Sequence, residues 1–344
     1  MQTITQLRLV VQISLSDVAT KAGVSTATVS RVLNGKELAR IPASTQERVR
    51  AAAVALNYHP NRFARGLQSR RTMNIGVLVD GLRNPFFAEL LDTLEEMIVA
   101  AGYDVLPDTG RRAANSDGSG LRGWPVDGVL MWAVGDMSIE MGGAAGELPV
   151  VYMGYPRSDG ADFVCHDAAQ GSRDALQHLW DKGHRRIAFV STATHDARCD
   201  TYAAFCQERG IRPEYLAIDQ GASAGEADQS AYRKGGFKVG QWLGEMPAGS
   251  RPTAVFCYND LIALGLMSGA ASCGLSIPGD LAIVGFDGID EGLYRARSLT
   301  TAEIPAKQLC GIALETLLRR LENDLPEEPR QVVLPMRLRA GTST

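Results

Sequence analysis

Few residues that could carry out catalysis stand at spacings that a reaction needs. Gly118, Gly120 and Gly123 form a GxGxxG sequence, the spacing of a dinucleotide-binding turn. That turn needs a strand before it and a helix after it, whereas no strand is expected before Gly118, and Trp124 and Pro125 follow Gly123. No GxxxxGK[ST] loop occurs, so the phosphate cradle of kinases and ATPases is also missing from the sequence.

Three histidines could act as the base of a serine hydrolase, provided that a serine and an acid meet the imidazole in space: His166, His184 and His195. We instead expect His195 to lie in a loop near Arg198, among acids that belong to the solvated surface. No residue is therefore assigned a catalytic role.

The six cysteines show neither a CxxC pair nor a cluster with histidine at metal-ligand spacing. They are predicted to be reduced thiols, most of them in the core, and no metal or cofactor is expected. The apolar stretch 7–13 is interrupted by Arg8 and Gln12, and no later stretch has the length of a membrane span. A cytoplasmic protein that contacts no membrane is expected.

Charge is unevenly distributed along the 344 residues. Residues 1–71 hold eleven Lys or Arg against three Asp or Glu, a net charge of +8, so the remainder carries −12 of the total of −4. A cationic head on an anionic body suits nucleic acid as the partner of the head, because neutralised phosphates release counterions. A solvated basic surface is the alternative explanation.

Two short helices are expected to position the polar residues of this head. The first begins at Ser14, and its apolar stripe consists of Leu15, Val18, Ala19 and Ala22. Gly23 ends this helix, and Ser25 can cap a second one with Val29, Val32 and Leu33 on its buried side. The opposite face of the second helix then carries Thr26, Ala27, Ser30 and Arg31.

A helix-turn-helix of this kind places its second helix in the DNA major groove. There Arg31 can reach a guanine edge or a phosphate, while the small Thr26 and Ala27 allow close approach to the bases. Any short helical hairpin shows the same periodicity, so the pattern alone leaves DNA binding open. A third helix is expected from Ser44, where residues 44–47 have the spacing of a capping box, with Val49 on its apolar stripe.

The remaining chain alternates between strand and helix patterns. The expected strands are residues 74–80, 103–106, 128–132, 150–153, 187–190, 254–257 and 282–286, and a helix is expected over 86–101. This alternation predicts an α/β body of parallel sheets, with ligands bound at the carboxyl ends of the strands.

Two stretches of the head resemble the LacI/GalR family of transcription regulators: LSDVATKAGVSTATVSRVLNG over 15–35 and LNYHPNRFARGL over 56–67. The resemblance implies that Thr26, Ala27, Ser30 and Arg31 contact DNA. It further implies that a hinge segment contacts the minor groove through Asn61, Arg62, Ala64 and Leu67. The loop over 34–45 is about two residues longer than the family pattern, and Pro42 stands where a phosphate-contacting Ser or Thr is common.

The body resembles the effector domain of the same family through IGVLVDGLRNPFFAEL, KGHRRIAFV, RPTAVFCYNDLIALG, IPGDLAIVGFDG and SLTTAEIP. The implied fold is a small all-α helix-turn-helix domain followed by two parallel-sheet α/β lobes of the type I periplasmic-binding-protein-like fold. The expected domains are 1–59 for the head, 60–73 for the hinge and 74–344 for the body. Lobe 1 is expected at about 74–161 and 292–322, and lobe 2 at about 162–291 and 323–344. The segment 110–126 is roughly ten residues shorter than the family's connection, which could remodel the dimer interface.

In that fold the ligand lies between the lobes. The positions that match the motifs are Asn84, Phe86, Phe87, Arg198, Asn259 and Asp287, and Thr194, Tyr232, Gly154 and Tyr155 are further candidates. Polar groups of these types suit a polyhydroxylated ligand, and a sugar or sugar derivative is expected. Plain core packing is the alternative role of at least one of Phe86 and Phe87.

The resulting hypothesis is a cytoplasmic, homodimeric transcription regulator, most simply a repressor, that binds an operator in double-stranded DNA and responds to a sugar-like effector. No appended heptad helix follows 332–338, which favours a dimer over a tetramer. Two rival hypotheses are an α/β enzyme of sugar metabolism with a basic head, and a sugar-binding transport component. A nucleophile with its base in the cleft would favour the first, and a signal peptide the second.

Overall fold

The computed structural model describes residues 13–33, 38–58, 71–109, 123–132, 148–156, 160–192, 195–218 and 230–344. The chain forms two compact units, Met1–Thr72 and Met73–Thr344, which we call the head and the body. No helix within the described ranges is long and apolar enough to cross a membrane.

The first helix of the head forms as the sequence predicts. In α1, Leu15–Ala22, the Ser14 side chain accepts a hydrogen bond from the Asp17 backbone, and the Asp17 carboxylate accepts one from the Ser14 N–H. This reciprocal capping satisfies two N–H groups that the first helical turn leaves without partners. Gly23 adopts a φ of 64° and ends the helix, a conformation that glycine reaches without strain.

The head is completed by α2, Thr26–Leu33, the 3₁₀ helix η1, Leu38–Arg40, and α3, Ala43–Ala55. Val18, Val29 and Val49, one from each α-helix, are fully buried at the centre of the three-helix core. The predicted capping box at Ser44 is wrong, because α3 begins one residue earlier and has no side-chain cap. Instead the Gln46 amide donates to the backbone oxygens of Leu38 and Ile41, which ties α3 to the preceding turn.

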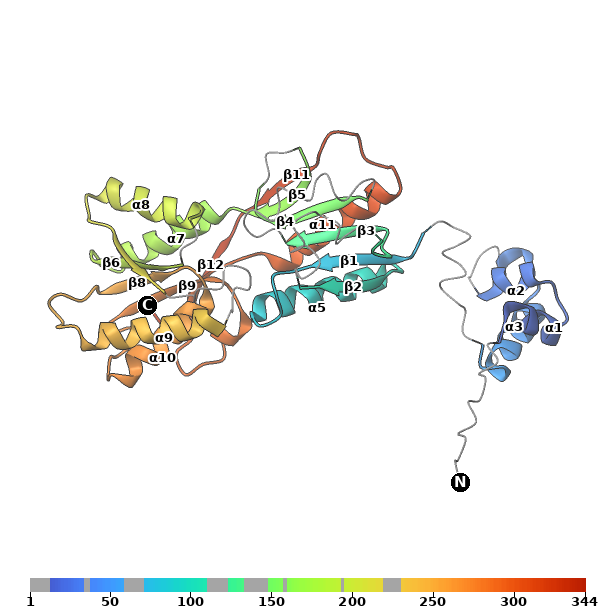
Figure 1. The fold of residues 1–344 in the computed structure, drawn as a ribbon, viewed down its shortest axis with the longest axis horizontal. Coiled ribbons are helices and arrows are strands. Elements are labelled where there is room, and N and C mark those ends of the chain that lie inside the picture. The colour runs from blue at the N-terminus through green and yellow to red at the C-terminus, as the bar shows by residue number, and fades with distance from the viewer. Residues whose placement is uncertain are drawn as a thin grey trace, which may run out of the picture. The chain divides into compact units, whose positions relative to one another are not determined.

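The body contains two parallel sheets, each covered by helices (Figure 1). The first lobe has the strand order β11-β5-β4-β3-β1-β2, and α5 and α11 pack together on it. Its elements are β1 Asn74–Leu78, α5 Pro85–Ala100, β2 Asp104–Asp108, β3 Gly128–Trp132, β4 Val150–Gly154, β5 Asp162–His166, α11 Ala306–Leu321 and β11 Gln331–Leu334.

The second lobe has the strand order β12-β10-β9-β8-β6-β7, in which only β12 runs antiparallel to its neighbour. Figure 1 shows the sheet between the α7–α8 pair and the α9–α10 pair. Its elements are α7 Ala168–Asp181, β6 Ile187–Ser191, α8 Ala197–Arg209, β7 Glu214–Ala217, α9 Ser230–Glu245, β8 Ala254–Cys257, α10 Asp260–Ser272, β9 Ala282–Asp287, η3 Asp290–Gly292, β10 Thr300–Glu303 and β12 Arg337–Arg339.

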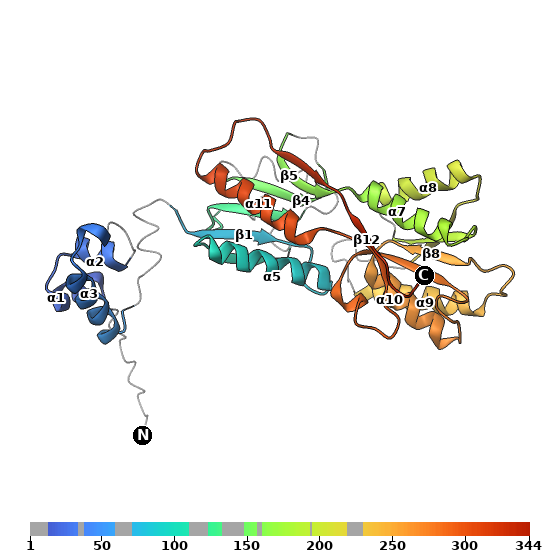
Figure 2. The same ribbon diagram turned by 180° about the vertical axis from the view of Figure 1, so that it is seen from behind.

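The chain passes between the lobes three times, after β5, after β10 and after β11, as the two opposite views show (Figure 2). This corrects the lobe boundaries predicted from the sequence: β5 and β11 belong to the first lobe, and β10 to the second. β5 belongs to the first lobe because it pairs with β4 and β11, and because Asp162 forms an ion pair at 2.7 Å with Arg320 of α11. The first crossing therefore falls between His166 and Asp167.

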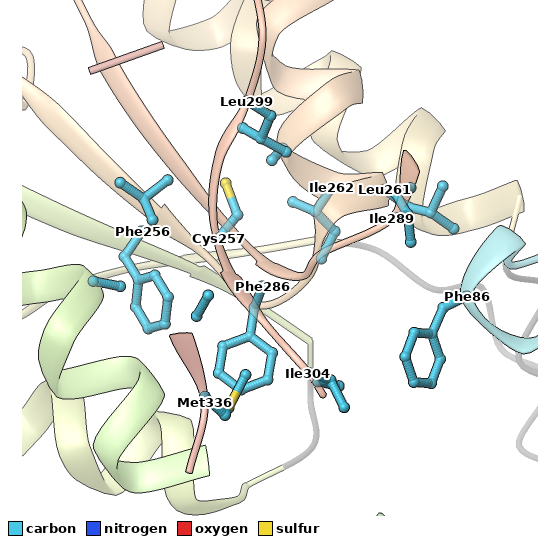
Figure 3. Close-up of a cluster of buried hydrophobic side chains, with 14 of the residues drawn as sticks. Phe86, Phe256, Cys257, Leu261, Ile262, Phe286, Ile289, Leu299, Ile304 and Met336 are labelled. Atoms are coloured by element: carbon cyan, nitrogen blue, oxygen red, sulfur yellow. The ribbon is translucent and has the colours of Figure 1, made fainter. Parts of the chain in front are cut away.

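A dense apolar core fills the second lobe next to the crossings. Phe256, Phe286 and Ile262 are fully buried between β8, β9 and α10, and Ile304 lies at the second crossing (Figure 3). Phe86 of α5, in the first lobe, belongs to the same buried cluster. The inner ends of the two lobes therefore share one hydrophobic cluster, next to the polar side chains described below.

Candidate functional site

The candidate DNA-binding face is the outer side of α2. Val29 and Val32 are buried in the head, so Thr26, Ala27 and Arg31 are exposed on the other side of the helix. Ser30 is half-buried at the edge of this face. Ser25 caps the helix, since its hydroxyl accepts from the Thr28 N–H at 3.1 Å. The remaining predicted DNA contacts, Asn61, Arg62, Ala64 and Leu67, lie outside the described residues.

The candidate ligand pocket lies in the body, between the two lobes and at the carboxyl ends of both sheets. Its residues come from the ends of strands, from the loops that follow them and from the first turns of the following helices. They are Asp80, Asn84, Phe86, Phe87, Trp132, Tyr155, His166, Arg198, Tyr232, Tyr258, Asn259, Asp287 and Ile304.

Two buried asparagines face this pocket from opposite lobes. Asn84 caps α5 by accepting from the Phe86 N–H at 3.1 Å, and Asn259 caps α10 by accepting from the Ile262 N–H at 2.9 Å. Each cap occupies only the amide oxygen, and no hydrogen bond to either amide NH₂ occurs within the described residues. Both side chains are buried, so each lobe offers a ligand two unused N–H donors.

Arg198 joins the two lobes across the pocket. Its guanidinium pairs with Asp196 at 2.5 Å, donates to the Tyr258 backbone oxygen at 2.9 Å, and donates to the Tyr155 hydroxyl at 3.0 Å. Its central carbon also lies 3.5 Å from the centre of the Tyr258 ring. Asp196, Arg198 and Tyr258 belong to the second lobe and Tyr155 to the first, so the Tyr155 hydrogen bond connects the lobes.

Asp287 ends β9 in a strained conformation with a φ of 117°, and its carboxylate lines the pocket. Asp260 holds the turn that follows, since its carboxylate accepts from the N–H groups of Gly288 and Ile289 at 2.8 and 2.9 Å. Thr301 donates to the same carboxylate at 2.7 Å. Burial, followed by the charge of Asp260, raises the pKa of Asp287 well above its ordinary value, and burial raises that of Asp260 to about 7.

Aromatic rings form the wall that the first lobe contributes. Phe86, Phe87 and Trp132 meet edge to face, with ring centres 5.0 to 5.7 Å apart. Gly154 lies against this wall with a φ of 93°, and a Cβ atom there would come within 2.5 Å of the Trp132 indole. Position 154 therefore has to be glycine so that Trp132 can occupy its place.

His166 is the last residue of β5 and lies among Trp132, Tyr155 and Phe286. Its ring is nearly parallel to the Trp132 indole, with an angle of 18° and a distance of 6.1 Å between ring centres. Burial, together with the positive charge of Arg198, lowers the pKa of His166 to about 3, so the imidazole is neutral at physiological pH. Its buried Nδ1 atom has no hydrogen-bond partner among the residues that the structure describes.

The pocket is small, with a cavity volume of about 60 Å³, and Arg198 and several aromatic rings line it. At about 15 Å³ per water molecule this volume holds only a few waters. A wider groove of about 410 Å³ adjoins it and shares Phe86, Asp287 and Ile304 with it. Within the described residues, no group of three or more His, Cys, Asp or Glu could hold a metal ion.

The structure brings together most of the ligand-contacting residues predicted from the sequence. Asn84, Phe86, Phe87, Tyr155, Arg198, Tyr232, Asn259 and Asp287 all line the pocket. Thr194 lies outside the described residues. Sequence reasoning missed Asp80, Trp132, His166, Tyr258 and Ile304. Each of these five ends a strand or follows one, so the rule that ligands bind at the carboxyl ends of parallel strands could have found them.

A GxSxG sequence, the spacing of a hydrolase nucleophile elbow, occurs around Ser223 over residues 221–225. It lies outside the described residues. Of the described histidines, His178 and His184 are hydrogen-bonded to Thr344 and Thr253, and His195 is paired with Asp200 on the surface. We therefore assign none of these three histidines as the base of a serine nucleophile.

A helix-turn-helix head and a two-lobed body with a polar pocket between its lobes define a class of proteins: DNA-binding transcription regulators with an effector domain. Comparison with protein families supports this class at both ends of the chain. Residues 14–61 match the bacterial regulatory proteins of the lacI family, and residues 176–344 match a periplasmic binding protein-like domain.

Similar proteins cover nearly the whole chain. The HTH-type transcriptional repressor PurR of Photobacterium profundum is 31% identical over 90% of this chain and 92% of its own length, and that of Vibrio vulnificus is 33% identical with the same coverage. A lac repressor dimer bound to operator and the anti-inducer ONPF shares the fold, with a TM-score of 0.80, 23% identity, and coverage of 96% of this chain and 98% of that one. A transcriptional regulator CelR–cellobiose complex has a TM-score of 0.66 at 25% identity, covering 96% and 100% of the two chains.

The chain belongs to the lacI family and is a DNA-binding transcription regulator of that family. Its architecture, a helix-turn-helix region followed by two parallel-sheet α/β lobes, is the one that the sequence predicts.

Proposed function

We propose that this protein is a homodimeric, effector-controlled repressor whose interlobe pocket binds a small polyhydroxylated ligand of the sugar class without transforming it. One observation carries the proposal: unused hydrogen-bonding groups from both lobes meet at one pocket, beside a wall of aromatic rings. The amides of Asn84 and Asn259 supply donors, and the Asp287 carboxyl group supplies a further hydrogen-bonding partner. Sugars match such a pocket because each hydroxyl both donates and accepts.

The solved relatives support a sugar-like ligand in a domain of this kind. One is the CelR–cellobiose complex, and another is a LacI family regulator from Enterococcus faecium with bound ribose, at a TM-score of 0.65 and 26% identity over 79% of this chain and 98% of that one. The relatives named as transcriptional repressors also support regulation over catalysis.

Binding has to rearrange the pocket, because its cavity of about 60 Å³ is smaller than a sugar ring with its hydroxyls. The Tyr155–Arg198 hydrogen bond is the contact that has to open, since it joins the two lobes and both of its residues line this space. Opening and closing around the three crossings would then alter how the two heads of a dimer meet operator half-sites about 34 Å apart. The effector supplies this coupling through its different affinities for the two states, typically about 1 to 3 kcal/mol.

A thermal-shift screen of the full-length protein tests the ligand class. The panel consists of D-glucose, D-ribose, cellobiose, D-gluconate and guanosine, each at millimolar concentration. A sugar that binds the folded state raises the melting temperature in proportion to the logarithm of its concentration. Every hit is then recovered and analysed chemically, and a converted compound would show that the pocket is an active site and would refute the proposal.

A further inference from the structure

His166 differs from the other described histidines in its hydrogen bonding. His178 and His184 each have a hydroxyl partner, at 2.8 and 3.0 Å, and His195 is paired with Asp200 at 3.5 Å on the surface. His166 is only 4% exposed, and within the described part of the chain no group is hydrogen-bonded to its Nδ1 atom. Since a polar atom without a partner costs free energy when it is buried, the imidazole needs a reason to be there.

Packing alone does not supply that reason. The neighbours of His166 are the rings of Trp132, Tyr155 and Phe286, at distances between ring centres of 5.9 to 6.1 Å. A phenylalanine would make the same ring contacts without leaving a nitrogen unsatisfied. What the imidazole adds is one N–H donor and one acceptor nitrogen, held in place by the surrounding rings.

The position of His166 points these groups at the ligand pocket. It ends β5 at the first crossing between the lobes, and its backbone pairs with Leu334 at the third crossing. The Asp167 N–H donates to the Leu334 oxygen at 2.8 Å, so the backbone next to the imidazole is anchored. The side chain lines the pocket together with Arg198, Asn259 and Asp287 from the other lobe.

We propose, resting on the function proposed above, that His166 is a specificity-determining residue, whose imidazole exchanges hydrogen bonds with one hydroxyl group of a sugar-class effector. A hydroxyl suits a neutral imidazole because it can accept from the ring N–H or donate to the other ring nitrogen. A carboxylate can use only the N–H. The site therefore selects a hydroxyl at one position of the sugar over a hydrogen atom or an acidic group there.

The first test measures stability without any ligand. Urea unfolding is compared for the full-length protein, His166→Phe, His166→Gln and His184→Phe. The proposal predicts that His166→Phe keeps or raises the unfolding midpoint, since the buried Nδ1 atom has no hydrogen-bond partner to lose among the described residues. His184→Phe lowers it, because Thr253 loses its partner. If both His166 variants lower the midpoint as much as His184→Phe does, the imidazole serves the fold and the proposal fails.

The second test measures specificity by isothermal titration calorimetry with D-glucose, D-ribose and their monodeoxy derivatives. The wild-type protein is expected to bind one sugar at least tenfold more tightly than its matching deoxy derivative. His166→Phe reduces that ratio to about one by weakening only the hydroxylated sugar, His166→Gln restores part of it, and His184→Phe leaves it unchanged. Unaltered ratios in His166→Phe for every sugar would overturn the assignment of His166 alone. If no sugar binds the wild-type protein, the proposed ligand class fails and this proposal fails with it.

Discussion

Arg198 shows how a single residue can decide the state of the pocket. Its cation is buried and satisfied by Asp196, the Tyr258 backbone and the Tyr155 hydroxyl, and these contacts keep the cavity small. A sequence can predict that an arginine lies near the pocket. It could not predict that this side chain lies across the pocket, because that depends on Tyr155, 43 residues away in the chain.

Removing one partner of this buried ion pair is expected to cost much more than removing both. Arg198→Met leaves the Asp196 carboxylate, only 13% exposed, without its cation, and a loss of about 3 kcal/mol in the free energy of unfolding is expected. The double variant Asp196→Asn/Arg198→Met leaves no isolated charge and is expected to lose less than half as much. Urea unfolding of both variants checks this, and equal losses would contradict the role given to the ion pair.

The two neighbouring carboxyls Asp260 and Asp287 predict a pH dependence. Both pKa values are raised in the folded protein, that of Asp260 to about 7, so the folded state binds more protons than the unfolded state between about pH 4 and 7. The free energy of unfolding should therefore fall as the pH rises through this window. Asp287→Asn removes one of the two carboxyls, and its stability should fall less steeply from pH 5 to 7.5 than that of the wild type. Urea titrations at several pH values give the slope of stability against pH for each protein. Equal slopes for the variant and the wild type would contradict this contribution of Asp287.

At the scale of elements, the strands in the interior of the two sheets are predicted accurately from the sequence. The expected ranges for β3, β8 and β9 agree with the structure to within one residue. Their apolar runs are long enough to stand out from the flanking polar residues. The sequence does not predict the short strands β5, β7, β10, β11 and β12, because their three to five residues show no clear period.

The predicted lobe boundaries are wrong for a related reason. Whether β5 lies in one sheet or the other depends on its partners β4 and β11, and β11 follows it by about 165 residues. The predicted start of α3 is one residue late, because Pro42 stands at the N-cap position and no side chain caps the helix. Local sequence patterns predict the helices and strands themselves, whereas contacts between distant segments decide to which lobe an element belongs.

Close packing of α9 and α10 gives a prediction at this scale. A Cβ atom at Gly265 would lie 2.1 Å from the Arg233 backbone oxygen, so Gly265→Ala must push the two helices apart. We expect a loss of about 3 kcal/mol in the free energy of unfolding. Gly311 in α11 has open space around its Cβ position, so Gly311→Ala is the matched control and should keep or raise stability by up to about 1 kcal/mol. Chemical denaturation of both variants decides, and equal effects would contradict the packing argument.

For the whole molecule, the division of labour follows the distribution of charge. The basic head presents Arg31 on the exposed face of α2, and the acidic body holds the polar pocket. The sequence predicts this division from composition and from the order of its motifs, without the long-range contacts that set the details of the pocket. We therefore expect a change in either part to alter one of two properties, operator recognition or effector response.

Fluorescence anisotropy on an operator duplex tests this division most directly. The duplex is selected by the wild-type protein from a random library, and the ligand is the strongest compound of the thermal-shift screen. For the wild type we expect affinity that falls steeply with salt concentration and changes about 5- to 150-fold when the ligand is added. Arg31→Ala should lose discrimination between operator and random duplex while keeping the thermal shift. Asp287→Ala should bind the operator normally and ignore the ligand. If the wild type shows no salt-dependent affinity for any duplex, or if both variants lose the same property, the account is contradicted.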